Sequence, residues 1–247
     1  GENELEALKL ARHVIGRTPW DYALTEKANP DRQYHFCNET LRQPFYQGTW
    51  RYDSCRKHRI FASSCAYPVK GFHYLLEAFG QIVKTYPDAT LAVPGKSFLT
   101  ASRLRRTNYQ KYLADLAEQY GVEDKIEFLG SLSGEEMKQA FLDANVFVLP
   151  STIENSPKSL GEAMLLGVPC VAADVGGVSN MLHPGQGYVY RSTAPYMLAH
   201  YITEVFRQQE RAEEMGAQAR LQAMETHNPE KNMRDLLEIY RVIAEER

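Results

Sequence analysis

Short apolar segments alternate with amphipathic helical patterns along most of this chain, and this alternation limits the folds open to it. The alternation runs from residue 58 to residue 190. In the first helical segment, apolar residues recur at intervals of three and four, from Phe72 through Phe79 to Val83, as in a helix with one buried face. Short strands of nearly continuous apolar content between such helices are typical of a parallel sheet covered on both faces. We therefore predict an open, doubly wound α/β domain.

The expected elements follow from these patterns and from residues that end helices. Strands are expected at residues 58–64, 89–95, 125–130, 145–151, 169–174 and 187–190. Helices are expected at residues 72–83, 108–120, 134–144 and 158–166, with a short one near Asn180. From residue 194 the pattern is helical except for a break at 227–230, and the helix at 230–245 carries an apolar stripe. This last helix should dock on the same domain or on a neighbour.

The first fifty residues have a different organisation. They contain a helical pattern at 2–12, a strand "HVIG", a turn "GRTPWD" into a helix at 20–28, and a strand "YHFCNE". These are one or two βα units with few partners, so we interpret residues 1–50 as the tail of another α/β lobe with its crossover. Residues 51–228 form the main domain and 229–247 a carboxy-terminal helix. The chain is expected to be a piece of a longer protein, and Trp20 is expected to pack between the two parts.

Composition and charge exclude several classes of protein. With 44% hydrophobic and 24% charged residues the chain is globular, and its formal net charge of -3 gives no field that favours nucleic acid or an anionic membrane. The four cysteines form no CxxC pair and have no histidine at zinc-ligand spacing, which favours reduced thiols in a cytoplasmic protein over a metal site. No segment is long enough to span a membrane.

The loop at residues 150–159 is the best candidate for a binding site. Ligands bind outside the carboxyl ends of parallel strands, where loops lead into helices. Pro157 suits the first helical position, so the N–H groups of Lys158, Ser159 and Leu160 should be free beside the positive end of the helix dipole. This arrangement predicts a seat for a phosphate group.

Two glutamates flank this seat. Glu162 could accept hydrogen bonds from the hydroxyls of a ribose, and Glu154 would face the group attached to the phosphate. Taken alone, either glutamate would more often serve only to complement the helix dipole.

The segment "PSTIENSPKSLGEAMLLGVPCVAADVGG" resembles the nucleotide-sugar site of retaining glycosyltransferase family 4. The shared features are a Glu, seven residues, then Glu-Ala-Met and a Gly-x-Pro strand entry, and the resemblance extends over roughly residues 58–245. It implies a GT-B architecture of two facing Rossmann-like lobes. This chain would then be the carboxy-terminal, donor-binding lobe with a remnant of the amino-terminal lobe.

The resemblance also implies roles for individual residues. Lys70 would contact the donor diphosphate, Glu154 the donor sugar and Glu162 the ribose hydroxyls. The backbone at Ser156, Lys158, Ser159 and Leu160 would hold the distal phosphate, and the loop at Gly130 and Leu132 would hold the base.

The implied reaction is transfer of a sugar from a nucleotide-diphosphate sugar to an acceptor hydroxyl by front-face attack, with no other cofactor and no metal. A carbohydrate or lipid-linked acceptor, a cell-surface polysaccharide among them, would bind through the mostly missing amino-terminal lobe. The piece alone should therefore be inactive. Peripheral contact of the full-length protein with a membrane stays open, as do the identities of the nucleotide, sugar and acceptor.

Three departures from the family pattern matter. The usual Arg five residues before the Lys is Cys65, the acid of "GGxxE" is Asn180, and Asn155 and Ser156 stand where Phe-Gly is usual. Cys65 in place of the arginine removes a positive charge from the diphosphate site, which Lys70 or a residue of the basic stretch at 95–112 must supply. That stretch could instead contact an acceptor or be a solvated loop. A nucleotide-sugar epimerase of the same architecture and a non-catalytic nucleotide-sugar-binding module remain alternatives.

Overall fold

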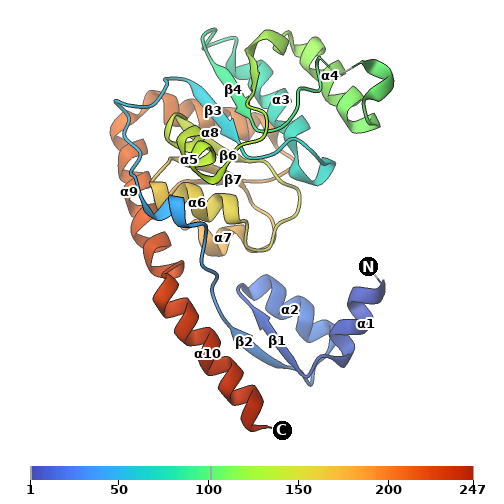
Figure 1. Cartoon of the computed structure of the whole chain (residues 1–247). Helices are drawn as coiled ribbons and strands as arrows, with labels where there is room; N and C mark the ends of the chain where they lie inside the picture. Colours follow the sequence, from blue (N-terminus) through green and yellow to red (C-terminus); the bar gives the residue numbers. More distant parts are fainter. Residues whose placement is uncertain (1, 101, 247) are drawn as a thin grey trace.

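The main domain is built on a six-stranded parallel sheet with the strand order β5-β4-β3-β6-β7-β8 (Figure 1). The computed structural model describes residues 2–100 and 102–246, the side chain of Arg103 excepted. The order reverses between β3 and β6, as in doubly wound nucleotide-binding folds. The strands are β3 (Arg59–Ala62), β4 (Thr90–Val93), β5 (Ile126–Phe128), β6 (Val146–Leu149), β7 (Cys170–Ala173) and β8 (Tyr188–Tyr190). The predicted fold class is confirmed.

Helices cover both faces of this sheet. Neighbouring residues of one strand enter opposite cores: Ile60 packs with one set of helices and Phe61 with the other, as the alternation of side chains along a strand requires. The first set is α3 (Phe72–Ile82), α4 (Asn108–Tyr120) and α8 (Pro195–Arg207). The second is α5 (Gly134–Leu142), α6 (Lys158–Leu166) and the short α7 (Val178–Met181). The helix α9 (Gln209–Thr226) contributes to both cores, with Ala212 and Met215 in the first and Ala219 and Ala223 in the second. Single 3₁₀ turns lie at η1 (Gln43–Tyr46), η2 (Pro68–Lys70), η3 (Arg103–Arg105) and η4 (Glu123–Lys125).

The amino-terminal part comprises residues 2–36 and has its own two-stranded parallel sheet. It contains α1 (Glu2–Leu10), β1 (His13–Gly16), α2 (Pro19–Ala28) and β2 (Gln33–Phe36). The last helix, α10 (Pro229–Glu245), leaves the main domain and runs along this part (Figure 1). Glu246 pairs with Arg12 at 2.8 Å, and the Cys37 thiol lies 3.8 Å from the carbonyl oxygen of Asn232. The last helix therefore docks on the neighbouring part.

Two details differ from the sequence-based expectation. Trp20 is 38% exposed and belongs to neither core, so its predicted packing between the parts is wrong; polar residues of the same turn make that contact instead. A further break at Gln208, whose backbone is not helical, separates α8 from α9. Among the described residues, no helix combines the length and apolar character that crossing a membrane requires.

The loops after β3 and β6 touch through their backbones. Gly71 has φ +65°, and a Cβ atom there would lie 1.8 Å from the carbonyl oxygen of Pro150. The N–H of Thr152 also donates to the carbonyl of Val69 at 2.9 Å. Only glycine permits this approach, which fixes the two loops against each other.

We predict that Gly71→Ala lowers the free energy of unfolding by at least about 2 kcal/mol more than Gly121→Ala, since a clash adds to the backbone strain. Gly121 is the matched control, because its φ of +63° is nearly the same and a Cβ there meets nothing within 4 Å. Urea unfolding of both variants measures the difference. Equal losses would show that the contact with Pro150 is dispensable.

Candidate functional site

The candidate site lies at the switch point, where the loops after β3 and β6 bring Lys70 and Glu154 together. The Lys70 ammonium lies 2.6 Å from Oε1 of Glu154, and the hydroxyl of Ser151 donates to the same oxygen at 2.8 Å. The Glu154 side chain is only 13% exposed. Within the described residues, its second oxygen, Oε2, has no hydrogen-bond partner. We call this space, lined by Ser63, Lys70, Ser151 and Ser159, the switch-point cleft.

The start of α6 borders this cleft. Pro157 is the N-cap, one position earlier than expected, and its carbonyl accepts the N–H of Leu160 at 3.0 Å. The prediction of a free amide at Leu160 is therefore wrong, because the first helical turn uses it. For Lys158 and Ser159, the part of the chain that the structure describes supplies no acceptor to the backbone N–H, as is usual in the first turn of a helix.

Glu162 is buried and paired with an arginine that the sequence did not single out. Its side chain is 3% exposed, and Arg42 donates to its two oxygens at 2.6 and 2.8 Å. The hydrogen bond to Glu162 raises the pKa of Arg42 against the opposing effect of burial. Arg42 comes from the crossover segment, residues 37–50. No local motif predicts its pairing with Glu162, which lies 120 positions later in the sequence.

A cavity of about 410 Å³ opens at the ends of β3, β4 and β5. Gly130 and Leu132 line it, as do Cys65 and Lys96. Burial raises the pKa of the Cys65 thiol to about 11, so this side chain is neutral at pH 7 and does not replace the charge of an arginine. Lys96, from the basic stretch, places a cation in the same cavity, which we call the strand-end cavity.

The loop after β6 also contacts the amino-terminal part. The Thr18 hydroxyl donates to Oδ1 of Asn155 at 2.5 Å, and Nδ2 of Asn155 donates to the Asp21 carboxylate at 2.8 Å. Burial raises the pKa of Asp21, but hydrogen bonds from Tyr34, from the Arg17 and Thr18 N–H groups and from Asn155 together lower it below its ordinary value. Asn155, noted as a departure from the family pattern, thus joins the two parts.

The glycine pair after β7 packs on the same loop. A Cβ at Gly176 would lie 1.6 Å from the carbonyl oxygen of Glu154, and the φ of Gly176 is +54°. Glu154 is thus confined between this turn and the contact that Asn155 makes with the amino-terminal part.

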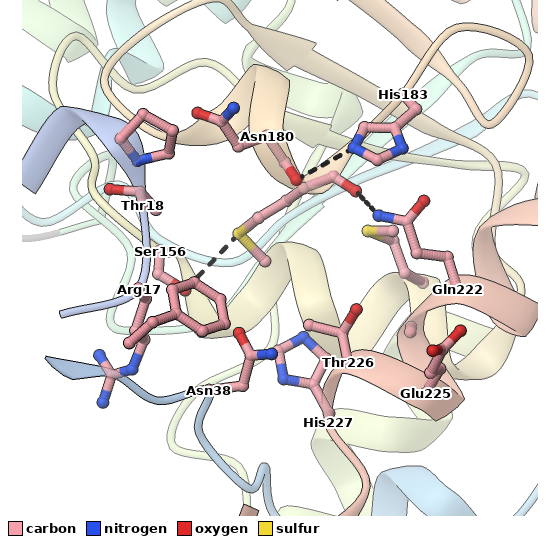
Figure 2. Close-up of a pocket in the computed structure, with 15 residues that line it drawn as sticks. Arg17, Thr18, Asn38, Ser156, Asn180, His183, Gln222, Glu225, Thr226 and His227 are labelled. Carbon is pink, nitrogen blue, oxygen red and sulfur yellow. Dashed lines mark hydrogen bonds between the residues drawn. The ribbon is translucent and has the colours of Figure 1, made fainter. Parts of the chain in front are cut away.

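A third cavity, of about 470 Å³, lies between the two parts (Figure 2). We call it the junction cavity. Its walls come from the turn before α2, from residues 36 and 38, and from α7 and the end of α9. The lining residues include Arg17, Thr18, Asn38, Asn180, Gln222 and Thr226. His183 also lines this cavity, and its Nε2 atom lies 3.2 Å from the carbonyl oxygen of Asn180.

Metal-ligating side chains do not gather in the described residues: no group of three or more His, Cys, Asp or Glu there could hold a metal ion. All four cysteines are buried and unpaired.

Comparison with known proteins identifies the family of the main domain. The family model described as glycosyl transferases group 1 matches residues 56–222, which include both loops of the switch-point cleft. The chain belongs to this glycosyltransferase family. D-inositol 3-phosphate glycosyltransferase of Corynebacterium urealyticum is 28% identical over 174 residues, and spore coat protein SA of Bacillus subtilis is 25% identical over 175 residues. The alignments cover 70% of this chain in both cases, and 40% and 45% of those proteins, so the chain spans less than half of each.

Solved glycosyltransferase structures share the fold. Sucrose-phosphate synthase of Thermosynechococcus elongatus superposes with a TM-score of 0.84 at 21% identity, covering 99% of this chain and 61% of that one. Anabaena HepE in complex with UDP and glucose gives 0.82 at 19% identity, covering 99% and 68%. The superpositions cover 99% of this chain and so include the amino-terminal part, which shares the fold of the corresponding part of these structures.

We predict that Asn155→Ala lowers the free energy of unfolding by about 1–3 kcal/mol, because it removes two hydrogen bonds and leaves a buried carboxylate short of a donor. Amide hydrogen exchange in residues 13–36 should accelerate. Asn180→Ala is the control, since the Asn180 side chain makes no hydrogen bond within the described residues. Equal effects of the two substitutions would contradict a role for Asn155 in joining the parts.

Stability should also depend on His227, which is buried where α9 ends and whose Nδ1–H donates to the Glu39 carbonyl at 2.9 Å. Burial lowers the pKa of His227 below its ordinary value of 6.5. As pH falls below that value, the unfolded chain binds a proton that the folded chain resists, so stability present above about pH 6.5 is lost in acid. We expect His227→Gln to flatten this loss in urea unfolding, whereas the exposed control His200→Gln keeps it. An unchanged profile in His227→Gln would assign the loss to other groups.

Proposed function

We propose that this chain is the donor-binding part of a retaining glycosyltransferase, which moves a sugar from a nucleotide-diphosphate sugar to an acceptor hydroxyl. The observation that carries the proposal is the contact of Lys70 with Glu154 at the switch point, beside the start of α6. A cation and a helix N-terminus at one cleft, with a carboxylate in contact with the cation, suit a diphosphate joined to a hydroxyl-rich group.

Lys70 and the N–H groups of Lys158 and Ser159 would hold the diphosphate. Their charge and dipoles are fixed before the reaction, so they would stabilise the negative charge that develops as the diphosphate leaves. The neutral thiol of Cys65 adds no charge here, and Lys96, which lines the same cavity as Cys65, would replace the charge of the missing arginine. We propose that binding needs no metal, because these groups supply the compensating charge.

Glu162 would accept the ribose hydroxyls. A carboxylate has about four lone-pair positions, and Arg42 uses one on each oxygen, so acceptor capacity remains. Arg42 also keeps the carboxylate charged and oriented in its buried position. The base would enter the strand-end cavity beside Gly130 and Leu132.

Glu154 would position the donor sugar through its free Oε2 atom, with the backbone of Ser156 close to the distal phosphate. Entry of the diphosphate would draw Lys70 away from Glu154 and leave Oε1 able to accept a sugar hydroxyl as well. Glu154 is thus a positioning group and not a base. The acceptor would attack from the face that the diphosphate leaves, which keeps the anomeric configuration.

Calorimetric titration of the chain with UDP, GDP and ADP tests this proposal. We expect one diphosphate to bind, also with a chelator present, and Lys70→Ala to weaken it at least about tenfold, which is 1.4 kcal/mol. Lys84→Ala is the matched control, because Lys84 is exposed and forms no ion pair with any residue that the structure describes. Binding that survives in Lys70→Ala, or no binding of any diphosphate at millimolar concentration, would contradict the proposal.

A second variant separates the sugar from the diphosphate. Glu154→Gln should keep the affinity for the free diphosphate, because it removes only a competitor for Lys70, and should weaken the nucleotide sugar. In the full-length protein, the anomeric configuration of the product decides whether the transfer retains it.

A further inference from the structure

The strand-end cavity has a side-chain carboxamide in its wall. Gln110, in the first turn of α4, lines it together with the loops that follow β3, β4 and β5, and this residue is partly buried. Pro94, Phe98 and Leu132 give the same wall an apolar character, which suits the flat face of a base. A carboxamide donates through its nitrogen and accepts through its oxygen, so the atom that is free decides what Gln110 can recognise.

The start of α4 fixes the orientation of this amide. The N–H of Thr107 donates to Oε1 of Gln110 at 2.9 Å, and the N–H of Gln110 donates to the Thr107 hydroxyl at 3.2 Å. The two hydrogen bonds form a capping box at the beginning of the helix. A flipped amide would turn Nε2 toward the Thr107 N–H and set two donors against each other. The backbone therefore uses the oxygen of Gln110 and leaves its nitrogen.

Nε2 of Gln110 has no acceptor among the described residues. A donor at a cavity wall normally finds a partner in the protein, in water or in a ligand, so this nitrogen is available to a molecule that enters the cavity. None of the described residues that line the cavity carries a carboxylate. The ammonium of Lys96, which also lines it, can only donate. The side chains whose polarity is fixed at this wall are thus donors.

The backbone beside the cavity is partly used. The N–H of Gly95 donates to the carbonyl of Gly130 at 2.8 Å, and the N–H of Gly130 donates to the carbonyl of Gly95 at 3.2 Å. These two N–H groups are therefore not free to bind a base. Recognition of the base depends more heavily on the remaining donors, with Gln110 among them.

A free donor distinguishes the common bases. Uracil and guanine each carry a ring carbonyl, which accepts, whereas adenine carries an amino group at the corresponding place, which donates. The Gln110 amide can donate to a carbonyl. Against adenine, two donors would meet, and the amide would be buried by the ligand without an acceptor.

We propose that Gln110 selects the base of the donor: its Nε2 atom donates to a ring carbonyl, so the chain binds a uridine or guanosine diphosphate in preference to an adenosine diphosphate. This selection rests on the proposed function, in which the base enters the strand-end cavity. Gln110 is then a specificity-determining residue, and it lies outside the loops that would hold the diphosphate and the sugar.

Calorimetric titration of the chain and of a Gln110→Glu variant with UDP, GDP and ADP tests the proposal. Glutamate is a usual residue at this position of a capping box, so one carboxylate oxygen keeps the hydrogen bond from the Thr107 N–H while the other replaces the donor Nε2 by an acceptor. We expect the unmodified chain to bind UDP or GDP at least about tenfold more tightly than ADP. The substitution should lower this ratio at least about tenfold.

Gln119→Glu is the matched control, since it adds the same charge to the same helix at an exposed residue that does not line the cavity. It should leave the ratio unchanged. The ratio separates recognition of the base from general electrostatics, because a negative charge that only repels the diphosphate weakens all three ligands alike. Circular dichroism checks that both variants fold.

Equal or tighter binding of ADP, or a ratio that Gln110→Glu leaves unchanged, would overturn this inference and keep the proposed function. If no diphosphate binds, the proposed function fails, and ligand-observed NMR with uridine, guanosine and adenosine decides the inference by itself. Binding of uridine or guanosine that Gln110→Glu abolishes would keep the base site. No binding of any nucleoside would reject the base site as well.

Discussion

The parallel pairing of β3 with β6 is the contact on which the rest of the site depends. Ile60 pairs with Val146, and Ala62 with Val148, so the two strands end at the same edge of the sheet. Chain connectivity reverses at this point, and the loops that follow diverge to opposite faces. The glycine at position 71 lets them meet before they separate. The pairing of β3 with β6 and the close approach at Gly71 together make Lys70 and Glu154 neighbours, although they are 84 positions apart in sequence.

The position of Glu154 depends on more than its own loop. The turn after β7 packs against its backbone, and the next residue, Asn155, is bound by Thr18 and Asp21 of the amino-terminal part. Movement between the two parts would therefore act on the residue next to Glu154. The geometry of the cleft is a property of both parts and not of the main domain alone.

Much of this could be predicted from the sequence, because periodicity and strand-end loops are local signals. The strand and helix pattern and the parallel sheet follow from these signals, whereas the placing of Lys70 and Glu154 at one donor came from the family resemblance. The Arg42–Glu162 pair and the role of Asn155 could not, since each joins residues over 100 positions apart with no motif at either end. The predictions for Leu160 and Trp20 failed for different reasons. The N–H of Leu160 is used locally, by the carbonyl of Pro157 in the first helical turn. Which side of the turn at Trp20 faces the main domain depends on tertiary contacts that propensity does not encode.

The path of α10 bears on the order in which the molecule can be completed during synthesis. Its residue Asn232 covers Cys37, 195 positions earlier, and Glu246 closes on Arg12. Within these residues, the amino-terminal part is translated before the main domain, and the helix that packs along it is translated after the main domain. Domains generally fold as units in order of synthesis, so the main domain can form while the amino-terminal part still lacks this cover. Residues 2–36 thus acquire the neighbours that α10 supplies only after the main domain has been made.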